Sequence, residues 1–177
     1  MDPLRQYEIA FVGLKIGVHH FNFHIDDQFF QLFGESIVTK GDIDIDLKFE
    51  KHPSFFMLNF HLQGSVCLPC DRCGAELDYP IDANDSVVVK FDEHREGDQD
   101  DSFADVIYIS RNDTHFSVSQ LIYEFINLSI PVNHVTCDNI TGKKPCDENV
   151  LNQLRHQGED TSHQDHRWDD LSKIKFN

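Results

Sequence analysis

The sequence predicts an α+β fold: a β-rich antiparallel sheet or partly closed barrel, one main covering helix and a polar C-terminal tail. Three observations support this prediction. Apolar and charged residues alternate over 41–50, apolar residues recur at helical spacing over 117–131, and residues 132–177 are polar and rich in histidine. We therefore divide the 177 residues into a β-rich core domain, 1–131, and a cysteine-containing tail, 132–177, with a short terminal helix.

The N-terminal part is expected to contain one or two strands and one short helix. Residues 7–25 are typical of strands, with turns at Gly13 and Gly17. Asp26 is in position to cap a helix that runs through Phe33, and Gly34 provides its end. We assign the Phe29–Phe30 pair to the core rather than to a docking patch.

The clearest pattern in the chain is a ladder of alternating residues. Four apolar residues over 43–49 alternate with Asp42, Asp44, Asp46, Lys48 and Glu50. A period of two indicates a strand with one buried and one solvated face. The aspartates resemble a metal site, but their strand neighbours on the other face are all apolar, which favours a solvated face.

A second strand follows a turn at 52–54 and pairs with the first as a long hairpin. It contains Leu58, Phe60 and Leu62 on one face, and Gly64 is expected to allow a bulge. Shorter strands are predicted over 87–91 and 106–109, with an acidic loop over 92–105 between them.

A helix is predicted to open at Ser117, which forms a capping box with Gln120, and to end at Pro131. Its apolar face consists of Val118, Leu121, Ile122, Phe125 and Leu128. This helix is expected to cover one face of the sheet. In the tail, 149–155 is predicted to be a short helix.

The charge balance restricts the class of partner. The chain contains 15 Lys and Arg against 31 Asp and Glu, a formal charge of −16. Such a surface repels phosphate, so direct contact with RNA is not expected, and a basic protein partner fits better. The simpler alternative is that the charge only maintains solubility.

No targeting or membrane segment is apparent. The longest early apolar stretch, Ile9–Leu14, is far shorter than the roughly 20 residues of a membrane helix. We therefore expect a cytoplasmic protein without a membrane partner.

The five cysteines are the most informative residues. Cys70 and Cys73 have the x2 spacing that lets two sulfurs face one metal ion, and Gly74 allows the chain to turn. Cys137 and Cys146 are candidates for the second pair of zinc ligands, with His134 as a substitute. The alternative is that the thiols are free or buried without metal.

Other chemistry is poorly supported. Cys67 extends the motif to C-x2-C-x2-C, but the fourth Cys and the Pro of a ferredoxin pattern do not follow. A thioredoxin-like pair requires a βαβ setting, which the sequence does not predict. The sequence also has no phosphate-binding loop, no G-x-S-x-G and no H-E-x-x-H. We therefore expect a non-enzymatic protein.

Several motifs, in order, resemble the YceD family of large ribosomal RNA accumulation proteins. They are the segment 64–73, which ends in C-D-R-C; the helix end Leu128-Ser129-Ile130-Pro131; the later cysteines Cys137 and Cys146; and the segment 165–171. That last segment is similar to the family's D-P-R-W-x-x-L, with His166 in place of its Pro.

The resemblance implies a bacterial or plastid factor that supports synthesis, processing or stability of large-subunit ribosomal RNA. The expected partner is a basic ribosomal protein or a large-subunit assembly intermediate, with Arg167, Trp168 and Leu171 as a linear docking element. Two other hypotheses remain: a thiol- or metal-responsive cytosolic adaptor, and an RNA hydrolase. The negative charge and the absent motifs argue against the hydrolase.

Overall fold

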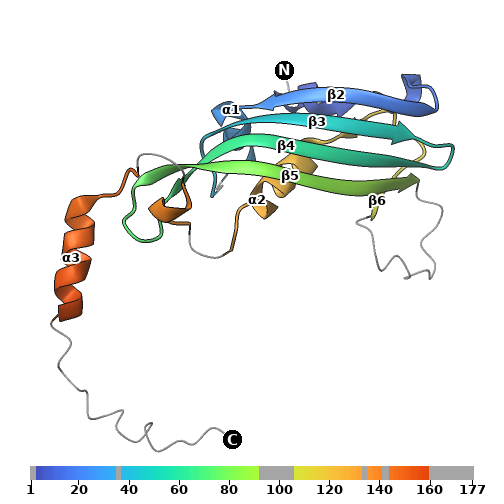
Figure 1. The fold of residues 1–177 in the computed structure, drawn as a ribbon. Coiled ribbons are helices and arrows are strands. Elements are labelled where there is room, and N and C mark those ends of the chain that lie inside the picture. The colour runs from blue at the N-terminus through green and yellow to red at the C-terminus, as the bar shows by residue number, and fades with distance from the viewer. Residues whose placement is uncertain (1–2, 35–36, 92–105, 133–134, 141–143, 160–177) are drawn as a thin grey trace, which may run out of the picture.

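The computed structural model describes residues 3–34, 37–91, 106–132, 135–140 and 144–159. Its main feature is a five-stranded sheet in the order β2-β3-β4-β5-β6 (Figure 1). The strands are β2 (Gly17–Ile25), β3 (Gly41–Lys51), β4 (Phe55–Pro69), β5 (Glu76–Phe91) and β6 (Val106–Ile109). The first four are antiparallel neighbours, whereas β6 runs parallel to β5. The α+β prediction is confirmed, and the sheet is open, with β2 and β6 at its edges, rather than a closed barrel.

The three central strands form two long hairpins because their alternating patterns match in register. Leu47 of β3 lies opposite Phe60 of β4, and both side chains are buried on the same face. Strand β5 is much longer than the predicted 87–91, since it pairs with β4 along its whole length, from Lys90 to Glu76. Its first half alternates less clearly, and Leu77 and Ile81 are its buried side chains there.

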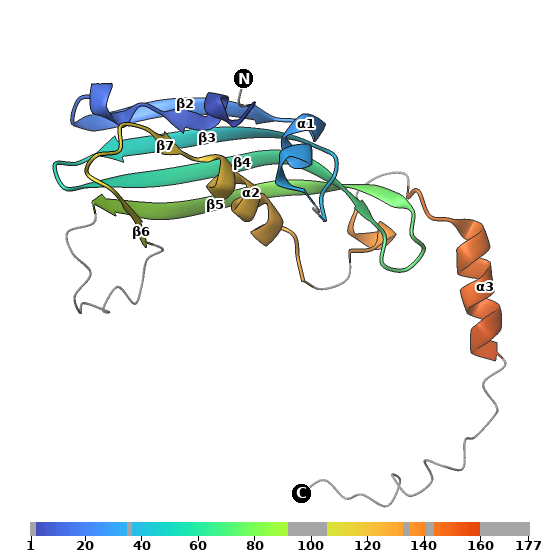
Figure 2. The ribbon, with the colours of Figure 1, turned by 180° about the vertical axis from the view of Figure 1, so that it is seen from behind.

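The described helices and short strands cover one face of the sheet and leave the other face open. Figure 2 shows that α2 (Ser119–Leu128) lies across the covered face, beside the N-terminal segment and α1 (Asp27–Phe30). The remaining covering elements are short: 3-10 helices at Pro3–Tyr7, Phe11–Gly13 and Gln31–Phe33, and the paired strands β1 (Glu8–Ile9) and β7 (Phe116–Ser117). Aromatic rings join the layers, as where Phe60 meets Phe125 with ring centroids 5.2 Å apart.

The short helix after β2 follows the sequence-based prediction. The Asp26 carboxylate accepts hydrogen bonds from the backbone N–H groups of Gln28 and Phe29, which satisfies two free donors of the first turn. Gly34, with φ of 71°, ends the segment in the left-handed region that favours glycine. The Phe29 and Phe30 rings are fully buried, as expected for core residues.

The predicted start of the main helix is wrong by two residues. Ser117 belongs to β7, where it pairs with Glu8, and α2 begins at Ser119 without a side-chain cap. Pairing with a distant strand therefore outweighs the local capping signal. Leu128 is also misassigned, because its side chain is 76% exposed while Ile126 is buried.

Gly64 serves a different purpose from the predicted bulge. It pairs regularly with Ile43 on one side and Ile81 on the other. A Cβ atom on Gly64 would lie 2.1 Å from the backbone oxygen of Asp42 and 2.7 Å from the Cα of Ile43. Two backbones therefore approach at this point more closely than any side chain allows.

The part of the chain after α2 returns to the sheet. Val135 and Cys137 are buried, and a 3-10 turn covers Cys137–Asn139. Helix α3 (Glu148–Glu159) follows and includes the predicted 149–155. None of the helices in the described ranges is long and apolar enough to cross a membrane.

Candidate metal centre

The turn between β4 and β5 contains the first two candidate ligands. Cys70 donates its backbone N–H to the carbonyl of Ala75 (2.8 Å), and Gly74 donates to the carbonyl of Cys70 (2.8 Å). Gly74 has φ of 72°, which reverses the chain where other residues would be strained. This tight turn brings the side chains of Cys70 and Cys73 to the same interior side, where they are 2% and 6% exposed.

The third candidate ligand comes from the segment after α2, which is fastened to this turn. Asp71 donates its backbone N–H to the carbonyl of Val135 (2.8 Å), and its carboxylate accepts the N–H of Val135 in return (2.6 Å). Two residues further along, Cys137 is completely buried. The reciprocal pair between Asp71 and Val135 therefore fixes the position of Cys137 against the turn.

A second set of contacts, all ionic, lies on the surface above the cysteines. The guanidinium of Arg72 pairs with the Asp138 carboxylate at 3.1 Å, and the same carboxylate pairs with Lys144. These side chains are about half exposed, so each pair contributes little to stability alone. They nevertheless join the turn, the 3-10 segment and the chain leading to Cys146.

The sulfur atoms of Cys70, Cys73 and Cys137 form a compact group. All three lie within 4.8 Å of one another, and the Sγ atoms of Cys73 and Cys137 are 3.5 Å apart. Zn–S bonds of about 2.3 Å in a tetrahedron place sulfurs about 3.8 Å apart. Three thiolates so arranged suit zinc, and thiolate donors also favour copper(I) and iron–sulfur clusters.

Cys146 lies next to this group without being part of it. Its side chain is partly buried and hydrogen-bonds with the thiol of Cys137, but it falls outside the set of sulfurs within 4.8 Å. Cys146 would therefore need a shift of its own segment to serve as a fourth donor. All five cysteines are free thiols in the structure.

The surroundings affect the acidity of two thiols in opposite directions. Burial opposes ionisation of Cys70, but backbone N–H groups of Cys73, Arg72 and Cys137 hydrogen-bond to its sulfur and lower its pKa to about 7. The pKa of Cys137 is raised, first by its hydrogen bond with Cys146 and then by burial and by the other two thiols. A metal ion would reverse the second effect, since it binds the thiolate form.

Several predicted residues are not part of this centre. Arg167, Trp168 and Leu171 lie outside the described residues, as does His134. Cys67 lies on the outer face of β4, opposite Asp78, and burial raises its pKa. The role of Asp71, in contrast, has no signal in the sequence, because nothing near Asp71 indicates that its carboxylate accepts a hydrogen bond from a backbone N–H 64 residues away.

Comparison with known proteins identifies a family. The family model for the large ribosomal RNA subunit accumulation protein YceD matches residues 58–175, more than half of the chain. The matched range begins in β4 and includes all five cysteines. Searches of curated proteins and of solved structures gave no match.

Proposed function

This chain belongs to the YceD family of large ribosomal RNA subunit accumulation proteins, and from that premise we propose that it is a non-enzymatic factor in large-subunit biogenesis. It supports the synthesis, processing or stability of large-subunit ribosomal RNA in the cytoplasm by binding a protein or an assembly intermediate. The family match over residues 58–175 is the observation on which the proposal depends.

The charge of the chain supports a protein partner rather than RNA. A formal charge of −16 opposes the approach of a phosphate backbone and attracts a basic protein. We therefore propose that the partner is a basic ribosomal protein, free or within an assembly intermediate. Arg167, Trp168 and Leu171 remain the proposed linear docking element.

We also propose that the cysteine group binds zinc in a structural role. Cys70, Cys73 and Cys137 would hold the ion, with Cys146 as the fourth ligand. A closed site of four thiolates is typical of structural zinc and stabilises the fold that contains it. Here it would fix the segment from Val135 to α3 against the β4–β5 turn. Without the ion, the Asp71–Val135 pair and the exposed ion pairs of Asp138 join this segment to the turn.

The biogenesis role is tested by the ratio of large- to small-subunit ribosomal RNA in cells depleted of this protein. We expect a specific fall in the large-subunit species, restored by the intact gene. An unchanged ratio in fully depleted cells would contradict the proposal.

The zinc role has its own test. Untagged protein purified with reductant is expected to contain about one zinc per chain by metal analysis. The protein with Cys70→Ser and Cys73→Ser should contain none, whereas Cys67→Ser, which changes a cysteine outside the group, should retain the metal. Equal zinc content in all three proteins would place the ion elsewhere.

The burial of the cysteines argues against the alternative role as a thiol switch. A redox sensor needs accessible thiolates, whereas Cys70, Cys73 and Cys137 are between 0% and 6% exposed. Alkylation distinguishes the two roles: thiols that bind zinc are expected to react slowly until a chelator is added, whereas sensor thiols would react quickly in the protein as purified.

A further inference from the structure

Among the residues that the structure describes, no element covers the outer face of the five-stranded sheet. The helices and short strands near the sheet gather on its other side (Figure 2). From Asp42 to Phe49 of β3, the residues that point outward are exposed while the alternate residues are buried, which identifies the open face. An uncovered face spanning several strands is available to a partner.

The strand register gathers carboxylates on one half of this face. Asp44 of β3 lies opposite Gln63 of β4, which lies opposite Asp82 of β5, and His24 of β2 completes this row. The neighbouring rows add further acidic side chains. The carboxylates on this half of the face are Asp42, Asp44, Asp46, Glu76, Asp78 and Asp82.

This half of the face contains few cations to neutralise the acids. Lys40 forms a pair with Glu76 at 3.5 Å. The β3 aspartates have weaker partners: Asp44 is 2.9 Å from His24 Nδ1, and Asp46 accepts a hydrogen bond from the amide of Asn22. The described part of the chain pairs no lysine or arginine with these aspartates, so the half-face is strongly negative.

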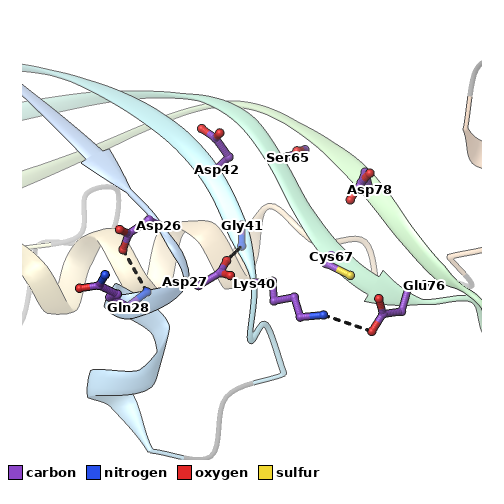
Figure 3. Close-up of a pocket in the computed structure, with 10 residues that line it drawn as sticks. All are labelled: Asp26, Asp27, Gln28, Lys40, Gly41, Asp42, Ser65, Cys67, Glu76 and Asp78. Carbon is purple, nitrogen blue, oxygen red and sulfur yellow. Dashed lines mark hydrogen bonds and ion pairs between the residues drawn. The ribbon is translucent and has the colours of Figure 1, made fainter.

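A hollow lies at the end of this acidic half (Figure 3). It has a volume of about 570 Å³ and combines the β2–α1 junction with the adjoining ends of β3, β4 and β5. Its carboxylates are those of Asp26, Asp27, Asp42, Glu76 and Asp78, and Lys40, Cys67 and Ser65 are among the other lining residues. The hollow is therefore a polar, acidic recess continuous with the bare strands.

We propose that this acidic half-face, with the hollow at its end, is the docking surface for an extended lysine- and arginine-rich segment of a partner protein. Charge complementarity determines the class of partner, because the surface repels phosphate and attracts Lys and Arg. Alternate side chains of β3 lie about 6.6 Å apart, and alternate side chains of an extended peptide have the same spacing. Successive basic residues can thus meet Asp42, Asp44 and Asp46.

That the partner is a ribosomal protein rests on the proposed function. The docking surface itself is tested with purified protein. The probe is a fluorescein-labelled peptide of about twelve residues in which Lys and Ser alternate, titrated with the full-length protein and followed by anisotropy at low and moderate salt. A peptide with Glu in place of Lys serves as the negative probe.

The variants separate a local surface from the net charge of the chain. The face variant combines Asp42→Asn, Asp44→Asn and Asp46→Asn. The matched control combines Glu8→Gln, Glu124→Gln and Glu148→Gln, three exposed carboxylates elsewhere that give the same change in charge. We expect the face variant to weaken peptide binding about tenfold and the control less than about twofold.

Two results would overturn the proposal. Equal losses in both variants would show that only net charge attracts the peptide. Binding of a labelled twelve-nucleotide RNA that the face variant abolishes would show that the surface serves nucleic acid instead. The unmodified protein, the face variant and the control variant should unfold at the same temperature, so that any difference between them reflects binding rather than loss of the fold.

The same variants separate this inference from the proposed function. If depletion lowers large-subunit ribosomal RNA and the face variant restores it as fully as the intact gene does, the surface proposal is wrong while the biogenesis role stands. If depletion has no effect but the face variant still loses peptide binding, the surface is real and the cellular role is wrong.

Discussion

The contact between Asp71 and Val135 leads to the most direct prediction. Asp71→Ala removes the carboxylate that accepts the N–H of Val135 at 2.6 Å, and leaves that partly buried donor without its partner. Hydrogen bonds to charged groups contribute about 1.5–3 kcal/mol, and an unpaired buried donor costs a similar amount. We therefore expect the variant to lose about 2 kcal/mol of unfolding free energy, measured by urea denaturation with the metal removed.

The same change should weaken zinc binding, because Asp71 positions the segment that contains Cys137 without itself contacting the metal. Outer contacts of this kind alter metal affinity by about 10- to 100-fold, and we expect a loss in that range by competition with a chromophoric chelator. The number of zinc ions bound at saturation should stay at that of the unmodified protein, which distinguishes a positioning residue from a ligand.

Two control variants test whether these effects are specific to Asp71. Arg72→Ala removes a pair between half-exposed side chains, and is expected to cost less than about 1 kcal/mol. Asp82→Ala removes an exposed carboxylate of β5 that pairs with His61 rather than with a residue of the cysteine group, and it should lower stability by less than about 1 kcal/mol and leave zinc affinity unchanged. If Asp71→Ala lowers stability no more than Arg72→Ala does, and lowers zinc affinity no more than Asp82→Ala does, the reasoning about the Asp71–Val135 pair is refuted.

Three further predictions concern packing and protonation. Gly64→Ala should lower the unfolding free energy by about 3 kcal/mol or more in urea denaturation, because the added Cβ would collide with the β3 backbone. Gly13 has open space around it, so Gly13→Ala should change stability by less than about 0.5 kcal/mol. Equal effects of the two changes would contradict the close approach at Gly64. Phe60→Ala should lower the unfolding free energy by about 4 kcal/mol in the same assay, since it leaves a cavity beneath the Phe125 ring. A loss below about 1 kcal/mol would mean that α2 does not pack against this part of the sheet. Zinc binding at pH 7 should release about one proton or more per ion, because the raised pKa of Cys137 keeps it a thiol until the metal binds. Zinc affinity should therefore rise with pH. Calorimetry in buffers of different ionisation heat measures the proton release, and equal binding heats in all buffers would contradict it.

The local patterns of the sequence were sufficient for much of the fold. The alternation over 41–50 predicts β3 and its buried face, since side-chain period is a property of the strand itself. The Asp26 cap and the stop at Gly34 were likewise predictable, because capping involves residues only two or three positions apart. The resemblance of the C-D-R-C segment to the YceD family also agrees with the family match.

The errors share a physical cause. Ser117 reads as a helix cap, but it pairs with Glu8 more than a hundred positions away, and nothing near Ser117 encodes that partner. Leu128 fits a helical stripe, yet only the docking angle of α2 decides which side of the helix meets the sheet. A glycine in a strand is typical both of a bulge and of a close approach between two backbones, and Gly64 provides the close approach.

The candidate metal centre divides in the same way. Sequence by itself determined that Cys70 and Cys73 lie in one turn, because x2 spacing followed by Gly74 restricts the backbone there. Only the tertiary structure decided that Cys137 lies 3.5 Å from Cys73, and that the acidic strands and the β2–α1 junction enclose one hollow. Such contacts depend on strand register and on the docking of distant segments, which are set by the whole core rather than by any local pattern.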